Sequence, residues 1–202
     1  MTFLLATRNR HKVSELRRLL KGRPIRILAQ DVFPGLPSVP EDGATFLANT
    51  VKKSLSASRR VVLPVLAEDS GLEVRALRGL PGVRSARYAG RSQDSKANIA
   101  KLIKAMAGIP PARRGARFVC VMAVSVGGRL VRTFRGTCGG SIALKPAARR
   151  GFGYDPVFIP KGSDRTMAQL GPALKDRVSH RRAAALQLTR WLKKFSPAGP
   201  AD

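Results

Sequence analysis

The stretch Leu66-Ala67-Glu68-Asp69-Ser70-Gly71-Leu72 brings two adjacent carboxylates to the end of an apolar run, just before a glycine of the kind found in turns. Residues 61–67 form that run and predict a buried strand. A rigid strand is a common support for functional carboxylates. The chain has a formal net charge of +26 and only 12 acidic residues. An acidic pair in such a chain indicates a site rather than surface decoration.

A second acidic pair, Glu41-Asp42, lies upstream and is followed by Gly43. It ends a loop over residues 30–44 that is rich in Pro, Gly and Asp. Magnesium prefers oxygen ligands and is usually held by one or two carboxylates together with substrate phosphates and water. The two pairs predict a site where Mg²⁺ meets a highly negative ligand, with these candidate metal ligands: Glu41, Glu68 and Asp69.

The bulk composition favours one globular domain, because 202 residues with 44% hydrophobic content can bury a sizeable core. No apolar run is long enough to cross a membrane. The apolar N-terminus is too short for a signal peptide and lacks a basic leader. We therefore expect a cytoplasmic protein without membrane contact. The two cysteines are too few for a disulfide framework, and we expect both to be buried in neighbouring strands: Cys120 and Cys138.

The positive charge predicts attraction to phosphate groups, either of nucleotides or of nucleic acid. Arginine is spread along the whole chain, so the charge raises affinity for any phosphate ligand without identifying one. Aromatic residues make up only 5% of the chain, and no basic stripe is interleaved with them. Stacking on single-stranded nucleic acid therefore has little support from the sequence.

Hydrophobic periodicity predicts an alternation of strands and helices. We expect strands over residues 3–6, 25–29, 72–77, 118–126, 130–137 and 157–159. We expect one helix over residues 11–21, a second that begins near Thr45, a third that ends at about Met106 and a fourth over residues 179–195. Gly127-Gly128 predicts a hairpin turn, and the glycines of 136–140 predict a kink or bulge. Expected helix caps are Ser92 or Ser95, and Ser179. The last helix carries its apolar face on Leu188, Trp191, Leu192 and Phe195.

Residues 7–12 connect the first strand to the first helix. A strand, a polar turn and a helix start can hold phosphate oxygens on backbone N–H groups and on the helix dipole. The Walker A pattern is missing, and an ordinary strand-to-helix turn fits these residues as well. Further candidate phosphate contacts are Lys12, Lys53, Lys175 and Arg181.

The segment Gly151-Phe152-Gly153-Tyr154-Asp155 suits a pocket for a nucleotide base. Glycines let the backbone approach a flat ligand, an aromatic ring can stack on it, and the carboxylate can accept hydrogen bonds from a purine edge. The two aromatic residues could equally be core residues in a tight turn. His180-Arg181, at the predicted start of the last helix, adds donors for an anion or a keto oxygen.

These motifs, in this order and spacing, resemble those of the inosine/xanthosine triphosphate pyrophosphatase family from residue 2 to about residue 193. The residues that carry the resemblance are Thr7-Arg8-Asn9 with Lys12, Thr45-Phe46 with Asn49 and Lys53, 67–72, 80–83 with 85–88, 152–156 and 179–181. The resemblance implies one two-lobed α/β domain over residues 1–202, with a long mixed twisted sheet, flanking helices and the active site in the cleft between the lobes. It also implies a homodimer.

The implied reaction is Mg²⁺-dependent hydrolysis of a purine nucleoside triphosphate, namely ITP, dITP or XTP, to the monophosphate and pyrophosphate. Asp69 would be the base that activates water, and it would share the magnesium with Glu41. The triphosphate and sugar would be contacted by Thr7, Arg8, Asn9, Arg10, His11, Lys12, Lys53, Ser70 and Lys175. A 6-oxo purine would be selected by Phe152, Gly153, Tyr154, Asp155, His180 and Arg181. Donors aimed at a keto oxygen would oppose the amino group of adenine.

Three positions and one segment depart from the family pattern, the segment being Gly171-Pro172-Ala173-Leu174 before Lys175, which is usually acidic. Arg8 stands where the family usually has glycine, Ala48 where it usually has glutamate, and Glu68 where it usually has aspartate. Together with the charge of +26, these departures motivate an alternative: a nucleotide- or nucleic-acid-binding protein of the same fold with weak or lost catalysis. A nucleic-acid binder would lose affinity steeply with salt.

Overall fold

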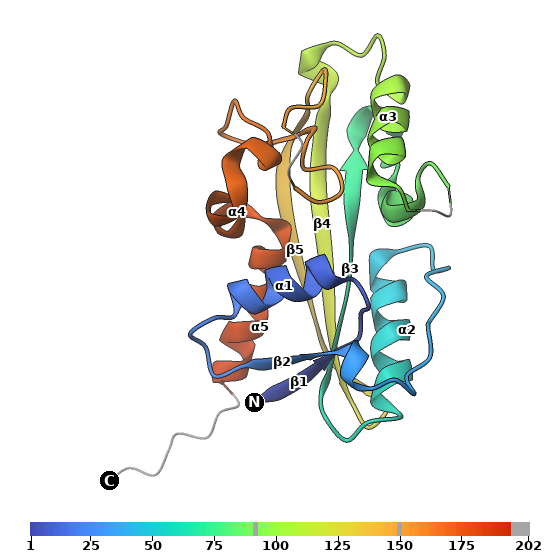
Figure 1. Ribbon diagram of the computed structural model, residues 1–202, viewed down its shortest axis with the longest axis vertical. Helices are drawn as coiled ribbons and strands as arrows, with labels where there is room; N and C mark the ends of the chain where they lie inside the picture. The colour runs from blue at the N-terminus through green and yellow to red at the C-terminus, as the bar shows by residue number, and fades with distance from the viewer. Residues whose placement is uncertain (91–92, 149–150, 195–202) are drawn as a thin grey trace.

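The structure is a computed structural model that describes residues 1–90, 93–148 and 151–194 (Figure 1). Its centre is a mixed six-stranded sheet with the order β2-β1-β3-β4-β5-β6. The first three strands in this order are parallel, and the pairs from β3 to β6 are antiparallel. The strands are β1 (Thr2–Leu5), β2 (Arg26–Ala29), β3 (Val65–Val74), β4 (Gly115–Val126), β5 (Arg129–Ile142) and β6 (Phe158–Pro160). This confirms the α/β class and the mixed sheet.

Three long strands, β3, β4 and β5, run along the molecule, and the other elements gather at its two ends (Figure 1). The lower end holds β1, β2, α1 and α2, and the upper end holds α3 and α4. Helix α5 packs on β4 and β5, while α2 packs on β3 and β4. The helices are α1 (Arg10–Leu19), α2 (Phe46–Ser58), α3 (Ser95–Ala105), α4 (Met167–Val178) and α5 (His180–Lys193).

Successive residues of β3 face opposite sides of the sheet. Leu66 packs with residues of α1 and α5, whereas Val65 and Ala67 pack on the side of α2. The same alternation governs the acidic pair that follows. Glu68 therefore points to the α5 side, and Asp69 points to the α2 side.

Strand β3 is continuous through Gly71, so the expectation of a turn at this glycine is wrong. A Cβ atom at Gly71 would lie 2.4 Å from the Ser85 Oγ and 2.6 Å from the Gly82 carbonyl oxygen. The glycine is needed because another segment approaches the middle of the strand. The separate strand expected over 72–77 is likewise wrong, because β3 ends at Val74 and a 3₁₀ turn follows over Arg75–Leu77.

The expected kink at the glycines of β5 is also wrong, since β5 runs unbroken and the register shift lies at Val124/Ser125. A Cβ atom at Gly136 would lie 2.1 Å from the His180 carbonyl oxygen. Like Gly71, this glycine serves the close approach of another backbone, here that of α5.

Two helix N-termini test the capping predictions. Helix α5 begins after Ser179, whose side chain accepts a hydrogen bond from the Arg182 N–H, and this cap is confirmed. Helix α3 is instead capped by Asp94, which bonds the Lys96 N–H. Ser95 is the first residue of that helix, and the alternative cap Ser92 lies outside the described residues.

Helix α5 buries Leu188 and Leu192, as its periodicity predicted, while Phe195 lies outside the described residues. Both cysteines are free and buried, in β4 and β5 as expected. Helix α4 is absent from the elements that the sequence predicted, and Gly171 interrupts it with a φ of +75°.

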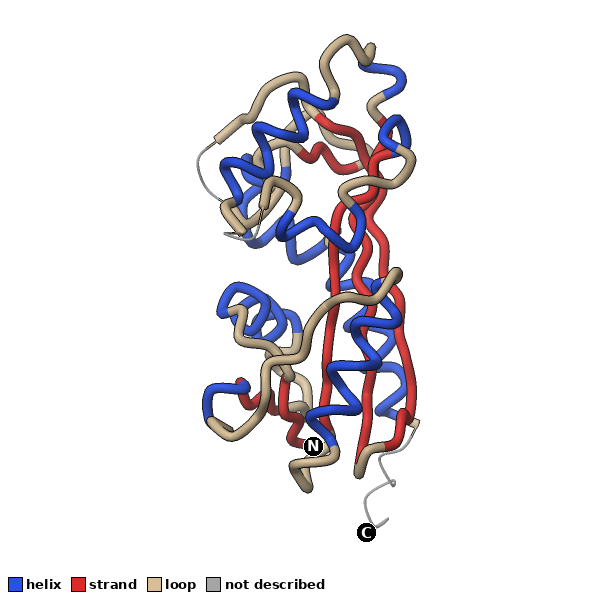
Figure 2. Tube along the Cα trace, turned by 90° about the vertical axis from the view of Figure 1, so that its right-hand side faces the viewer, coloured by secondary structure: helices blue, strands red, loops and turns tan. Residues whose placement is uncertain are grey.

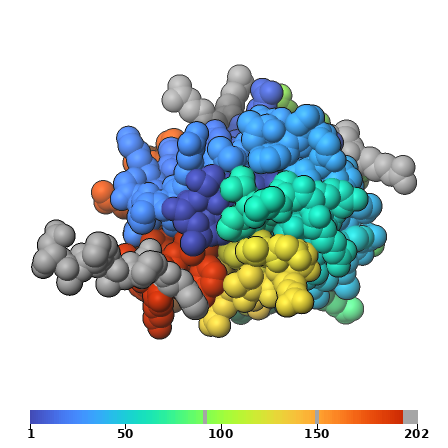
Figure 3. Space-filling model, turned by 90° about the horizontal axis from the view of Figure 1, so that it is seen from below, coloured from blue at the N-terminus to red at the C-terminus, as the bar shows by residue number. Residues whose placement is uncertain are grey.

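The lower end of the molecule is a closed surface (Figure 3), formed by the N-terminal segment, the turn before β3 and the β4–β5 hairpin beside the end of α5. Figure 2 shows the long strands running through both ends of the molecule, with a helix of the lower end lying across them and other helices projecting to the left. Within the described residues, no helix is long and apolar enough to cross a membrane.

Candidate active site

A cavity of about 540 Å³ lies among residues that are distant in the sequence. This volume is within the range of small-molecule sites. Its wall combines the turn after β1, the loop before α2, the middle of β3, the loop before β6 and the start of α5. Sequence-predicted residues that line it are Thr7, Arg8, Asn9, Lys12, Glu41, Lys53, Asp69, Ser70, Phe152, Gly153, Tyr154, Asp155, Lys175, His180 and Arg181.

Asp69 is the best-placed carboxylate of this cavity and is only 4% exposed. Its Oδ2 accepts a hydrogen bond of 3.0 Å from the Asn49 Nδ2, and its Oδ1 accepts one of 2.9 Å from the Ser70 N–H. Burial raises the pKa of Asp69, although the charges of Lys53 and Lys12 oppose the rise. A fixed carboxylate with a raised pKa can take a proton from a neighbouring water.

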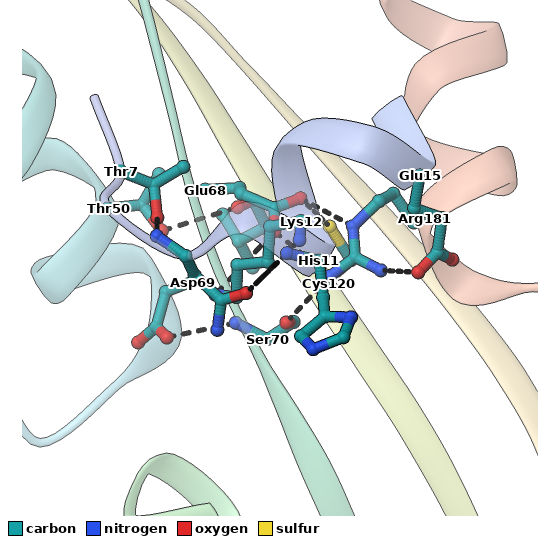
Figure 4. A network of polar contacts seen from close by, with 12 residues as sticks. Thr7, His11, Lys12, Glu15, Thr50, Glu68, Asp69, Ser70, Cys120 and Arg181 are labelled. Atoms are coloured by element: carbon teal, nitrogen blue, oxygen red, sulfur yellow. Dashed lines mark hydrogen bonds and ion pairs between the residues drawn. The ribbon is translucent and has the colours of Figure 1, made fainter. Parts of the chain in front are cut away.

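Glu68 does not line the cavity with Asp69, so the expectation that the two carboxylates act side by side is wrong. Its Oε2 accepts from the Arg181 Nε at 2.8 Å, and its Oε1 accepts from the Arg181 Nη2 at 2.9 Å. Lys12 adds an ion pair at 3.5 Å. Burial would raise the pKa of Glu68, but Arg181 and Lys12 outweigh it and lower the pKa to about 2. Both oxygens are thereby committed to cations of the protein (Figure 4).

Glu41 is the second carboxylate that faces the cavity. The Lys53 ammonium donates to its Oε1 at 2.5 Å and to the Glu68 carbonyl oxygen at 2.7 Å. Burial raises the pKa of Glu41, but the nearby cations, Lys53 foremost, outweigh it and the pKa falls below its usual value. Lys53 is itself only 9% exposed, so it belongs to the site rather than to the solvated helix face.

We tested whether these residues fit a divalent cation. Within the described residues, no group of three or more His, Cys, Asp or Glu side chains is placed to hold a metal by itself. Glu41 and Asp69 nevertheless supply two carboxylates on the wall of one cavity. Such a pair suits Mg²⁺, which commonly takes one or two carboxylates and completes its shell with phosphate oxygens and water. The donor set therefore fits magnesium only together with a phosphate ligand.

The turn over residues 7–12 is ordered by its own side chains. Asn9 caps α1, because its Oδ1 accepts from the N–H groups of His11 at 3.0 Å and Lys12 at 3.2 Å. The Asn9 N–H donates to the Thr7 Oγ1 at 3.2 Å. These bonds hold the Lys12 side chain near the cavity, where it is mostly buried.

Arg8 reaches across to the loop before α2 and donates to the Leu36 carbonyl oxygen at 3.2 Å. It lines the mouth of the cavity, although glycine was the expected residue type for the family. Arg10 and His11 do not line the cavity, so the structure does not bring these two of the predicted phosphate contacts together with the others.

The segment predicted to form a base pocket divides between the cavity and the core. Phe152 lines the cavity, and its N–H donates to the Asp155 Oδ2 at 2.8 Å. Lys175 donates to the same oxygen at 2.6 Å. Tyr154 is a core residue as well as a wall residue, because it is 4% exposed and its hydroxyl donates to the Ser85 carbonyl oxygen.

His180 and Arg181 begin α5 and are both buried. The His180 ring stacks on Phe118 with 4.8 Å between centroids, and its Nδ1 has no hydrogen-bond partner. Burial, and then the charge of Arg181, lower the pKa of His180 well below 6.5, so the imidazole is neutral. A neutral ring with a free nitrogen beside a cavity can bond a polar ligand atom.

Glu15 is a site residue that sequence reasoning missed. It is 4% exposed, and its Oε2 lies 2.7 Å from the Arg181 Nη1 and 3.6 Å from the Lys175 ammonium. The sequence did contain an indication that Glu15 is buried, because it lies between Val13 and Leu16, which are both on the buried face of α1. An acid on an apolar helix face needs a buried partner. Two further residues on the site had no predicted function: Asn49 and Arg87.

The fold is α/β with a mixed sheet, and its cavity is lined by cations and by the carboxylates of Glu41, Asp69 and Asp155. Such a site suits a small polyanion together with a divalent cation. Residues 3–191 match the Ham1 family. The chain belongs to that family. It is 51% identical over 191 residues to the dITP/XTP pyrophosphatase of Mycobacterium tuberculosis (strain ATCC 25618 / H37Rv), which covers 92% of each chain.

Other relatives agree in sequence and in fold. The dITP/XTP pyrophosphatase of Geobacillus kaustophilus is 45% identical over 185 residues, with 92% of this chain and 91% of that protein covered. The structure of the Staphylococcus aureus Ham1 protein superposes with a TM-score of 0.85 at 36% identity, covering 97% of this chain and all 100% of the other. These likenesses confirm the family that the motifs indicated.

Proposed function

We propose that this protein hydrolyses non-standard purine nucleoside triphosphates, ITP, dITP and XTP, to the monophosphate and pyrophosphate. The observation that carries the proposal is the cavity in which Asp69, with a raised pKa, lies with the ammonium groups of Lys12 and Lys53. Relatives at 45% and 51% identity are dITP/XTP pyrophosphatases. Such an enzyme would keep these nucleotides out of DNA and RNA.

In the proposed reaction, Asp69 accepts a proton from water, and the water oxygen bonds to the α-phosphorus as the bond to the bridging oxygen breaks. Pyrophosphate leaves with the electrons of that bond. The fixed position of Asp69 between Asn49 and Ser70 supports this assignment, because a base must be held within hydrogen-bond reach of the water. Lys12 and Lys53 would neutralise the charge on the phosphate chain.

Glu41 and Asp69 would hold Mg²⁺ together with the substrate's phosphates. When bound, the ion would polarise the phosphoryl group and offset its negative charge. Glu68 is left out of this ligand set because Arg181 takes both its oxygens. Its contribution is to hold Arg181 and Lys12 at the site.

Base selection would rest on the far end of the cavity. Phe152 offers a ring for stacking, and His180 has an unpaired Nδ1 at the wall. In the tautomer that carries a proton on Nδ1, His180 would donate to the 6-keto oxygen of hypoxanthine or xanthine. The amino group at this position in adenine would present a donor to a donor, which disfavours ATP.

The decisive experiment mixes the purified protein with Mg²⁺ and ITP, XTP, dITP, GTP or ATP and measures pyrophosphate and orthophosphate separately. We expect pyrophosphate from the first three substrates. Asp69→Asn should lower kcat by about 10²- to 10⁴-fold, whereas Asp164→Asn, the same change at an exposed position, should have no effect. Absence of pyrophosphate with ITP, dITP and XTP would overturn the proposal.

The proposal also includes a homodimer, as the family resemblance implied, and a cytoplasmic location. Sedimentation measures the oligomeric state. Binding of nucleic acid without turnover is the alternative, motivated by the net charge of +26. It predicts a steep loss of affinity between 50 and 200 mM salt, on the order of 10³-fold or more. A flat salt response would exclude it.

A further inference from the structure

The His11 ring stacks on Phe152, with 5.0 Å between ring centroids and an interplanar angle of 26°. His11 is the second residue of α1, at the lower end of the molecule, while Phe152 belongs to the loop before β6. In Figure 4 the His11 ring extends out from the α1 ribbon. The pair therefore joins two segments that only the fold brings together.

The two rings are not equivalent with respect to the cavity. Phe152 lines it, and His11 is not among the described residues that do. His11 stacks on one face of the Phe152 ring, so a ligand in the cavity would stack on the other face. Offset aromatic stacks of this kind stabilise the relative orientation of their rings.

The backbone of both residues is fixed independently of the stack. The His11 N–H donates to the Asn9 Oδ1 at 3.0 Å, within the cap of α1. The Phe152 N–H donates to the Asp155 Oδ2 at 2.8 Å. Each ring can then rotate only about its own side-chain bonds, and the contact with the other ring restricts that rotation.

We propose that His11 is a positioning residue for base recognition, which supports one face of the Phe152 ring so that a flat heterocyclic base can stack on the other face. The ligand class is the base of the nucleoside triphosphate, so the inference rests on the proposed function. It differs from the expectation that His11 contacts the phosphates. Its ring lies on Phe152, and its N–H is already bonded to Asn9.

The test compares a ligand that carries a base with one that lacks it. Calorimetry measures Kd for ITP and for inorganic tripolyphosphate, with Mg²⁺, in an Asp69→Asn background that prevents turnover. We expect His11→Ala to weaken ITP binding by about three- to tenfold, the value of an aromatic pair, and to leave tripolyphosphate binding unchanged. His11→Phe should restore ITP binding. Ser14→Ala, at an exposed and uncharged position of the same helix outside the cavity wall, is the matched control and should change neither.

Four results would overturn the inference. Equal loss of ITP and tripolyphosphate binding in His11→Ala would make the residue a phosphate contact. Unchanged ITP binding in that variant, or no recovery of ITP binding with His11→Phe, would show that His11 does not support the Phe152 ring. An inactive wild-type protein that still binds ITP would overturn the proposed function alone, while a wild-type protein that does not bind ITP would overturn both.

Discussion

The substitution Glu68→Gln should destabilise the protein strongly, because it removes one of the two carboxylates, Glu68 and Glu15, that balance the buried charge of Arg181. Arg181 is 2% exposed and Glu68 is 0% exposed. The guanidinium makes two hydrogen bonds to this carboxylate, of 2.8 and 2.9 Å. Glutamine keeps the size and one acceptor but lacks the negative charge. Breaking a buried ion pair typically costs about 3–5 kcal/mol, since one charge is left behind.

The lowered pKa of Glu68 gives a second way to obtain the free energy of unfolding that Glu68→Gln should lose. Arg181 and Lys12, against the opposing effect of burial, lower it from 4.5 to about 2. A difference of about 2.5 pKa units corresponds to about 3 kcal/mol between the charged and neutral carboxyl. Because the folded-state pKa is the lower one, this stability is fully present above pH 4.5 and is lost as the pH falls toward 2.

The assay is urea unfolding followed by circular dichroism at fixed protein concentration. At pH 7, Glu68→Gln should lose about 3 kcal/mol of unfolding free energy, and the gap to the wild type should narrow between pH 5 and pH 3. Glu73→Gln is the matched control. It breaks an ion pair to Arg117, whose side chain is 54% exposed, and should cost less than about 1 kcal/mol. A loss for Glu68→Gln no larger than the control, or a gap that does not change with pH, would refute the reasoning.

Three further predictions concern the strand, the base and the metal. Gly71→Ala should lose about 1–3 kcal/mol of unfolding free energy in the same urea assay. Gly139→Ala should not, because no atom lies within 4 Å of the new Cβ. Equal losses in the two variants would contradict the close approach of Ser85 to Gly71. Burial raises the pKa of Asp69 above 3.8 in the free protein, so kcat/KM for ITP should begin to fall with acid at a pH above 3.8. An unchanged kcat/KM down to that pH would argue against Asp69 as the base. EDTA should stop pyrophosphate release and added Mg²⁺ should restore it; turnover that persists in EDTA would exclude the metal.

Local patterns were enough to predict several elements. The β4–β5 hairpin follows from two apolar runs around Gly127-Gly128, and α5 follows from its apolar periodicity and the Ser179 cap. Both depend on interactions within a few residues. The break expected at Gly71 failed because glycine has the same local signature in a turn and in a strand that another segment approaches. Only the packing of Ser85 against β3 distinguishes the two cases.

The candidate site residues could be predicted from the amino-acid sequence alone, because acidic pairs in a basic chain, a glycine–aromatic segment and a His-Arg pair are recognisable from residue type and order. Which of these residues line the cavity and which pair with other buried side chains depends on the tertiary structure. Glu68 and Asp69 are neighbours in the chain, but the alternation of a strand sends them to opposite faces. One then meets Arg181, 113 residues away, and the other meets the cavity. Glu15 and the stack of His11 on Phe152 depend in the same way on partners that only folding brings within reach.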